Sequence, residues 1–399
     1  MMNFPGVIDA FDNVISKIAV AQGGLIDGHA PGLSGKELNA YIVAGIYSDH
    51  ESVSLPEAAE KLKHGMRIMI REGSSEKNLE ALLPLVNDKN YKRCMLVVDD
   101  RSCADLLRDG DIDAVVRKAI KLGLEPVRAV QLATINPAEY FGLRGLGAVA
   151  PGYNANLIVL DNLSDFNIEK AFYNGKLVVD GGEALFEVAE YKGEKPLHTV
   201  NIKLFSIEDL KLEAKEDSLS VIGVVPGQII TKKIIEKVKV VDGAVMTDTE
   251  RDLLKLVVVE RHKASGNTGI GLVNGFGLKR GALASSIAHD SHNVIAVGTN
   301  DADIFAAIKQ VEKMQGGLVA VADGRVLADL PLPIGGLLSD QTLEEVVAQL
   351  ERLKTLAFEL GSKLQSPFAT LSFMALPVIP ELRLTDLGLV DVGQFRIIE

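Results

Sequence analysis

Two histidines and a pair of aspartates come directly after apolar, strand-like segments of the chain: His29, His50, Asp99 and Asp100. Imidazole and carboxylate groups together suit Zn, Mn or Fe. In β/α barrels the active site is built at the carboxyl ends of the strands, so side chains at several such ends can share one ion. A single histidine at a strand end is more often a capping or solvated residue. Side chains able to bind metal at three such ends favour a metal site.

The segments that carry these groups alternate strand-like and helix-like patterns between about residues 20 and 145. The strand candidates are residues 25–28, 45–48, 67–70 and 94–98. Helical patterns begin at Ser34 and Pro56 and cover residues 79–86, 114–122 and 127–133. Such alternation implies parallel strands with helical crossovers. A closed β/α barrel has eight such units, and the sequence shows half of them, so half a barrel or an open sheet is predicted.

Two further regions follow the alternating segment. Residues 146–180 place glycines and prolines around short apolar runs, which is typical of a small β module. The last region has strand candidates at 256–259, 294–297 and 317–322 and helix candidates at 303–314 and 343–360. We therefore predict three domains, over residues 1–145, 146–185 and 186–399.

The composition excludes several classes of protein. Lys and Arg total 42 against 54 for Asp and Glu, a net charge of -12, which argues against a sequence-independent nucleic-acid binder. No uninterrupted apolar run is long enough for a membrane span, and the first residues show no signal-peptide pattern. The two cysteines, Cys94 and Cys103, are too few for a disulfide framework and favour a reduced, cytoplasmic setting. A soluble enzyme with a small-molecule substrate is expected.

Several longer motifs resemble the adenine deaminases of the amidohydrolase superfamily. They cover residues 1–7, 27–35, 48–51, 98–101, 151–157, 286–293 and 376–382. Each motif alone is weak, but the combination extends over nearly the whole chain and is specific. The resemblance implies an α/β fold: a partial (β/α)8 TIM-type barrel, formed by its second half, followed by a small β-sandwich module and an α+β C-terminal domain.

The resemblance also implies roles for individual residues. His29 and His50 correspond to the metal-binding histidines after the fifth and sixth barrel strands. Asp99 corresponds to the aspartate that binds metal and shuttles the proton; Asp100 is its catalytic or substrate-facing neighbour, and Glu51 a substrate-binding group. The implied metal is Mn²⁺ or Fe²⁺, with Zn²⁺ as the alternative. The implied reaction is hydrolysis of adenine to hypoxanthine and ammonia, in purine salvage or catabolism.

Two ligand motifs of the family have no counterpart in this sequence. The family has a His-x-His pair after the first barrel strand, whereas no histidine precedes His29. It also has a metal-binding glutamate directly before the Met-Met-Asn-Phe-Pro motif, which here begins at Met1. We therefore expect an N-terminally truncated chain whose exposed sheet edges lead to a homo-oligomer or to pairing with a separately encoded N-terminal half. A misplaced start codon would explain the same features.

A second candidate site lies in the last region, at His289, Asp290 and His292. These groups could bind a second metal or close over the active site, although a polar turn at a domain interface is the favoured interpretation. Two other functions stay open at this point. One is a different cyclic-amide hydrolase or aminohydrolase on the same scaffold, and the other is a non-catalytic scaffold protein built on a decayed barrel.

Overall fold

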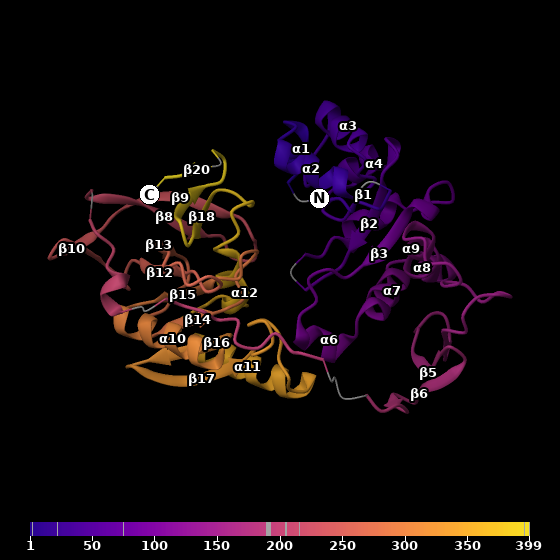
Figure 1. Cartoon of the computed structure of the whole chain (residues 1–399). Helices are drawn as coiled ribbons and strands as arrows, with labels where there is room; N and C mark the ends of the chain where they lie inside the picture. Colours follow the sequence, from indigo (N-terminus) through magenta and orange to yellow (C-terminus); the bar gives the residue numbers. More distant parts are fainter. Residues whose placement is uncertain are drawn as a thin grey trace. The chain divides into compact units, whose positions relative to one another are not determined.

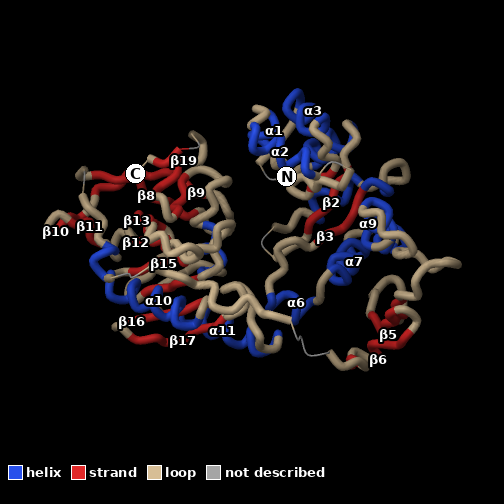
Figure 2. The backbone as a smooth tube through the Cα atoms, in the orientation of Figure 1, coloured by secondary structure: helices blue, strands red, loops and turns tan. Residues whose placement is uncertain are grey.

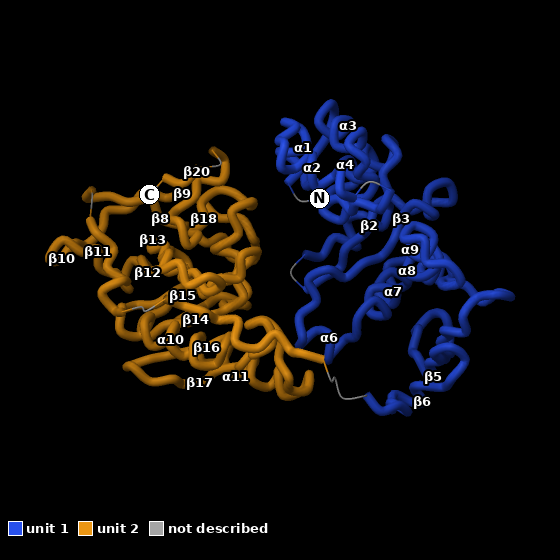
Figure 3. The backbone as a smooth tube through the Cα atoms, in the orientation of Figure 1, with its two compact units in different colours: residues 1–191 blue, residues 192–399 orange. Residues whose placement is uncertain are grey.

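The computed structural model describes residues 1, 3–21, 23–74, 76–188, 193–203, 206–214, 216–394 and 396–398, so Met2 of the opening motif lies outside the described residues. Figure 1 shows the elements along the chain and Figure 2 their secondary structure. The chain divides into two compact units, residues 1–191 and 192–399 (Figure 3). The finer division into three domains stays a prediction. Among the described residues, none of the helices has the length and apolar character needed to cross a bilayer.

The first unit is built on a parallel sheet of three strands in the order β1-β2-β3. The strands are β1 (Ser48–Asp49), β2 (Arg67–Arg71) and β3 (Cys94–Val97). Helix α4 (Leu55–Lys63) connects β1 to β2, and α5 (Leu79–Leu82) with the 3-10 turns η1 (Leu83–Leu85) and η2 (Tyr91–Arg93) connects β2 to β3. The carboxyl ends of all three strands therefore lie at one edge of the sheet, as the predicted strand–helix alternation requires.

Apolar faces of the helices bury this sheet. Helices α7 (Ile112–Lys121) and α8 (Pro126–Ala133) pack on β3. Their buried residues, among them Val115, Val116 and Leu132, share one core with β2, β3 and α4. The other helices of the unit are α1 (Phe4–Ile8), α2 (Asp12–Val20), α3 (Gly35–Val43), α6 (Cys103–Asp109) and α9 (Ile135–Tyr140).

The first two predicted strands differ from the structure. Residues 25–28 form no strand, and the second strand is the short pair Ser48–Asp49. The cause is the hydrogen bonding of Gly28, whose N–H donates to side-chain oxygens, Ser48 Oγ at 3.2 Å and Asp27 Oδ1 at 3.0 Å, and not to a strand ladder. The backbone of Gly28 also lies so close to β1 that a Cβ there would be 1.9 Å from the Ser48 carbonyl oxygen.

The remainder of the first unit is a four-stranded antiparallel sheet in the order β4-β5-β6-β7. Its strands are β4 (Leu157–Leu160), β5 (Ile168–Tyr173), β6 (Lys176–Asp180) and β7 (Glu183–Ala184). The predicted small β module is thus a β sheet. A second sheet facing it, which a sandwich needs, is not among the residues described in this unit, and the sandwich stays a prediction.

The second unit centres on an eight-stranded mixed sheet in the order β17-β16-β14-β15-β12-β13-β8-β9. Its strands are β8 (Ser218–Val224), β9 (Thr231–Lys237), β12 (Leu254–Val259), β13 (Thr268–Asn274), β14 (Ala282–Ser285), β15 (Val294–Gly298), β16 (Gly317–Ala322) and β17 (Arg325–Pro331). Helix α10 (Asp301–Met314) covers its central strands through a shared apolar core (Figure 2). The strands and helices predicted for this region are all present, with ends displaced by a few residues.

Smaller elements complete the second unit. They are the 3-10 turn η3 (Ile207–Leu210), the hairpin of β10 (Lys239–Val241) and β11 (Ala244–Met246), helices α11 (Leu343–Glu359) and α12 (Pro367–Phe373), and the sheet of β18 (Leu382–Thr385), β19 (Gly388–Asp391) and β20 (Arg396–Ile397). Sheet and helices together give this unit α+β content.

The close approach of Gly28 to β1 predicts that Gly28→Ala destabilises the chain. The added methyl group meets a backbone oxygen, which cannot rotate away as a side chain can, so we expect a loss of at least about 1–3 kcal/mol. Thermal unfolding followed by circular dichroism measures it. Gly393→Ala is the control, because a Cβ there meets nothing closer than 3.6 Å. Equal unfolding midpoints for the two variants would contradict the close approach.

Candidate metal centre

His29 and His50 converge beyond the end of β1, although 21 residues separate them. His29 Nδ1 lies 3.3 Å from His50 Nε2. Glu51 Oε1 lies 3.3 Å from the first nitrogen and 3.4 Å from the second. The donor atoms of these three residues lie within 4.8 Å of one another, and they form the one such group found among the described residues.

These three separations fit a shared ion. Two ligand atoms that each lie about 2.0–2.2 Å from a tetrahedral ion are roughly 3.3–3.5 Å apart. Two imidazole nitrogens and a carboxylate oxygen also form a donor set that suits Zn, Mn and Fe. Three protein ligands leave a coordination position open for water or substrate, as in catalytic zinc sites. His29, His50 and Glu51 therefore fit a catalytic metal.

Polar groups contact the backbone of His29 and the second ring nitrogen of His50. The backbone N–H of His29 donates to Tyr41 Oη at 3.0 Å, and Tyr41 lies on α3. The His50 Nδ1 atom, on the side of the ring away from His29, faces Asp27 Oδ2 at 3.8 Å. This distance is longer than a hydrogen bond, but Asp27 is the carboxylate that the free ring nitrogen faces, and metal-bound histidines generally have such an acceptor. The sequence alone could not identify it.

Burial sets the charge of His29. It lowers the pKa of the imidazole below its usual range, and the neighbouring Glu51 carboxylate offsets this only in part. The ring is therefore neutral at pH 7. A neutral imidazole is the form that binds metal, so no proton has to be displaced from His29 on binding.

Arg71 connects this group to Asp99. It is the last residue of β2, and its side chain is only 4 % exposed. Its Nη1 lies 2.5 Å from Glu51 Oε1 and 2.6 Å from Asp99 Oδ2, while Nη2 lies 3.1 Å from Glu51 Oε2. Burial lowers the pKa of Arg71, but Glu51 and Asp99 raise it above its usual value overall, so the guanidinium is charged.

Asp99 is thus linked to the two histidines through Arg71 and Glu51 and does not itself belong to the group of three donors. It adopts the left-handed conformation, with φ 60°, which turns the chain sharply after β3. Strained residues of this kind cluster at functional sites. Arg71 was not among the site residues predicted from the sequence. The signal was a charged residue at the end of a buried strand, at the same sheet edge as the predicted ligands.

Asp100 lies against the loop that follows β2. A Cβ on Gly73 would be 1.5 Å from Asp100 Oδ1, so any larger residue there would displace the Asp100 carboxylate. The Glu76 N–H faces Asp100 Oδ2 at 3.4 Å, and the Asp100 carbonyl accepts a hydrogen bond from Ser74 at 3.1 Å. The structure places the Asp100 carboxylate beside this loop. Its catalytic or substrate-facing role stays a prediction.

The second candidate group, His289, Asp290 and His292, lies in the second unit. His289 Nδ1 is 3.6 Å from Asp290 Oδ1, and the two imidazole rings are 5.6 Å apart. The His289 ring stacks on Phe373 at 5.0 Å. These residues are neighbours, but among the described part of the chain they do not bring three donor atoms to one point.

Other side chains hold the 289–292 loop by its backbone. The buried Arg261 binds the His292 carbonyl, and His262 Nε2 lies 2.7 Å from the Ser291 carbonyl. The Ala288 N–H points to His292 Nδ1 at 3.3 Å. Burial lowers the pKa of His292, and the nearby His289 and Arg261 lower it further. These contacts favour a polar turn fixed by its surroundings.

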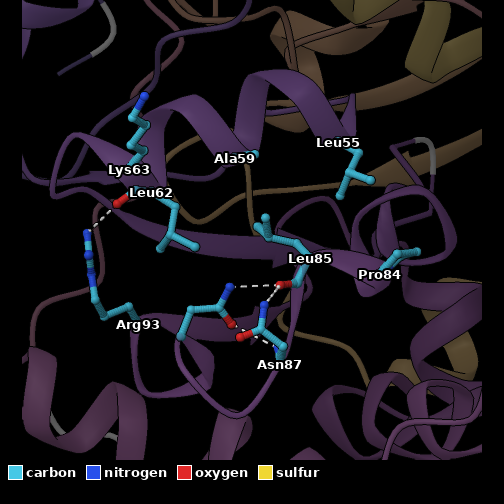
Figure 4. A pocket seen from close by; sticks show the side chains of 9 residues that line it. Leu55, Ala59, Leu62, Lys63, Pro84, Leu85, Asn87 and Arg93 are labelled. Atoms are coloured by element: carbon cyan, nitrogen blue, oxygen red, sulfur yellow. Dashed lines mark hydrogen bonds between the residues drawn. The ribbon is translucent and has the colours of Figure 1, made fainter.

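The first unit also has a surface pocket of about 510 Å³ that contains none of the candidate ligands (Figure 4). Its lining residues are Leu55, Ala59, Leu62, Lys63, Pro84, Leu85, Asn87, Asn90 and Arg93. Its amides and guanidinium are already bonded to protein carbonyls: the two Asn side chains donate to Leu85 and Arg93 donates to Leu62. The pocket therefore offers shape but no convergent reactive groups.

Comparison with known proteins adds family information for both units. The model of the amidohydrolase family matches residues 9–178, and that of the adenine deaminase C-terminal domain matches residues 228–396. An adenine deaminase of Dehalococcoides mccartyi (strain ATCC BAA-2266 / KCTC 15142 / 195) is 61 % identical over 398 residues, covering 100 % of this chain and 70 % of that protein. Adenine deaminase 2 of Carboxydothermus hydrogenoformans is 48 % identical, with the same coverage. An adenine deaminase of Methanothrix thermoacetophila is 47 % identical, over 99 % of this chain and 69 % of that protein.

The buried position of Arg71 predicts a large loss of stability on Arg71→Met. The substitution leaves the half-buried Glu51 carboxylate without its cation, and removing one partner of a buried ion pair typically costs about 3–5 kcal/mol. Urea unfolding of the whole chain measures the loss. Arg108→Met is the matched control: this arginine also binds two carboxylates but is 66 % exposed, so its loss is expected to change the stability little. Similar losses in both variants would contradict the buried bridge.

Proposed function

Because the chain belongs to the adenine deaminase family of amidohydrolases, we propose that it hydrolyses adenine to hypoxanthine and ammonia with the help of a divalent metal at His29 and His50. Curated relatives named adenine deaminase share 46–61 % identity across nearly all of the chain. Identity of this extent does not favour the two alternatives, a different cyclic-amide hydrolase or a non-catalytic scaffold. The reaction belongs to purine salvage or catabolism.

The observation that carries the site assignment is the 3.3–3.4 Å spacing of His29 Nδ1, His50 Nε2 and Glu51 Oε1. We propose the two histidines as ligands. Glu51, which the sequence suggested as a substrate-binding group, has the position of a third ligand, and we propose that role for it. Mn²⁺ or Fe²⁺ is the proposed ion and Zn²⁺ the alternative, since this donor set suits all three.

The chemistry that a bound divalent ion supplies is activation of a water molecule, whose pKa falls to about 7. The chain's own residues handle the protons. Arg71 bonds to Asp99 Oδ2 and so holds the carboxylate in place, and we propose that Asp99 takes the proton of the water and returns it to the departing amine. The C6–O bond forms first and the C6–N bond then breaks, so that the amine, with the proton from Asp99, leaves as ammonia and the second proton of the water stays on hypoxanthine. Asp100 stays the proposed neighbour that contacts the purine.

Two further parts of the proposal concern the surroundings of the chain. A second copy, or a separately encoded N-terminal half, is the proposed protein partner. The support is that β1 and β3 are edge strands in the described part of the sheet, and such edges tend to pair. A cytoplasmic location is proposed from the free thiols of Cys94 and Cys103. Burial raises the pKa of the Cys94 thiol to about 12, so it is chemically inert.

The ligand assignment predicts that His29→Ala and His50→Ala each weaken Mn²⁺ and Zn²⁺ binding at least about tenfold, because each removes one of a few protein ligands. Calorimetric titration of the purified, metal-stripped chain gives the Kd. His64→Ala is the control, since this histidine is exposed at the end of α4. Unchanged Kd values for the first two variants would exclude this site.

The proton-transfer role predicts a different result for Asp99→Asn. The amide keeps a hydrogen-bond acceptor for Arg71 but cannot take a proton, and loss of a general base typically costs about 10²–10⁴-fold in rate. Ammonia and hypoxanthine formation from adenine measure the rate, and metal content measured on the same sample shows whether the ion is retained. An Asp99→Asn chain that forms ammonia as fast as the unsubstituted chain would remove Asp99 from the mechanism.

A further inference from the structure

Lys61, a buried lysine on α4, lies directly behind the metal group. From its contacts we infer that Lys61 is a positioning residue: it ties the loop of His29 to the loop of His50 and Glu51 and so sets the affinity of the metal site. This inference rests on the proposed function, because it concerns the same three ligands. Nothing in the sequence pattern distinguished this lysine from the exposed Lys63 two residues later.

The ammonium group of Lys61 is fully enclosed, with a side-chain exposure of 0 %. Its Nζ lies 2.7 Å from the Ala30 carbonyl oxygen, 2.9 Å from Asp49 Oδ2 and 3.2 Å from Ser52 Oγ. A fourth acceptor, Glu57 Oε1, lies 2.7 Å away. A lysine ammonium has three N–H donors, so every donor of this group has an acceptor within reach.

Each of three acceptors is the sequence neighbour of a proposed ligand. Ala30 follows His29, Asp49 precedes His50, and Ser52 follows Glu51. One ammonium group therefore contacts the residue adjacent to every ligand. Both loops bond to the same atom, Lys61 Nζ. A shift of Lys61 would therefore change the position of the two loops relative to each other.

Asp49 reinforces the same connection. While its Oδ2 accepts from Lys61, its Oδ1 accepts the N–H of Ala30 at 2.9 Å. The Ser52 hydroxyl donates to Asp49 Oδ2 at 2.7 Å. Ala30 is thus held at both its carbonyl and its N–H by one buried ion pair, and this fixes the backbone on which His29 is carried.

Helix α4 is the rigid base of this network. Glu57 lies one helical turn before Lys61, and its Oε1 also accepts the N–H of Gly32 at 2.8 Å. Glu60 on the same helix accepts the N–H of Gly35 at 2.9 Å. The helix therefore holds the 30–35 segment along its length. Ligand geometry in a metal site has to be kept to within about 0.5 Å, and a helix with buried charged contacts provides that stiffness.

A buried ion pair is weak evidence for stability, since apolar residues often replace one without loss. The placement of this network beside every ligand points to geometry as its role. Residues that orient the ligands of a metal typically change affinity about 10–100-fold when removed. A purely structural lysine would change stability and leave the affinity of the folded protein unaltered.

The test compares Lys61→Met with Lys255→Met in the whole chain. Lys255 is the matched control: it is 3 % exposed, is bonded to the Leu210 carbonyl and Asp301, and lies in the second unit. Both variants are expected to unfold at lower temperature than the unsubstituted chain. Only Lys61→Met is expected to bind Mn²⁺ and Zn²⁺ about 10–100-fold more weakly, as measured by calorimetric titration below the unfolding temperature.

Two milder variants keep the test decisive if Lys61→Met does not fold. Ser52→Ala and Glu57→Gln each remove or weaken one contact of Lys61 and are expected to raise the metal Kd in the same direction by a smaller factor. Wild-type Kd values in every folded variant would overturn the inference, and so would an equal loss in Lys255→Met. Two other results would instead overturn the proposed site itself. One is an unsubstituted chain that binds neither ion, and the other is a His29→Ala variant that binds both ions as tightly as the unsubstituted chain.

Discussion

Attraction between two buried cations and the carboxylates around them holds the candidate site together. Lys61 lies behind the histidine loops and Arg71 lies at the end of β2, both with almost no solvent exposure. Between them they bind Asp49, Glu57, Glu51 and Asp99. In a chain with a net charge of -12, acidic groups this close together repel one another unless cations are placed among them. The two cations allow a carboxylate to stay beside two imidazoles.

The parallel sheet supplies the frame for this arrangement. β1, β2 and β3 end at one edge, and each end contributes a group: His50 and Glu51, Arg71, and Asp99. His29 arrives from a segment without strand structure, and the Gly28 contact with β1 keeps that segment close. The site therefore depends on both secondary structure and a few short-range polar contacts, and the second of these is the more easily disturbed by substitution.

The sequence predicted the part of the site that follows from strand ends. His29, His50 and Asp99 were identified because each follows an apolar run, and the structure does bring the two histidines together. Arg71 and Lys61 could not be found in this way. A lysine four residues after a glutamate on a helix is the pattern of an exposed ion pair, and only the tertiary packing shows that this one is buried.

The strand expected at residues 25–28 was wrong because the periodicity of apolar residues does not show that Gly28 bonds to side chains. In the second unit, sequence proximity predicted that His289 and His292 are neighbours, but the stacking on Phe373 depends on a contact from far along the chain.

The proposed site requires that His29 and His50 share one ion. Crystals of the chain soaked with Zn²⁺ and measured at the zinc absorption edge test it most directly. One strong anomalous peak is expected about 2.0–2.1 Å from both His29 Nδ1 and His50 Nε2, with Glu51 beside it. A zinc peak at another place in the chain, with the two imidazoles unliganded, would contradict it.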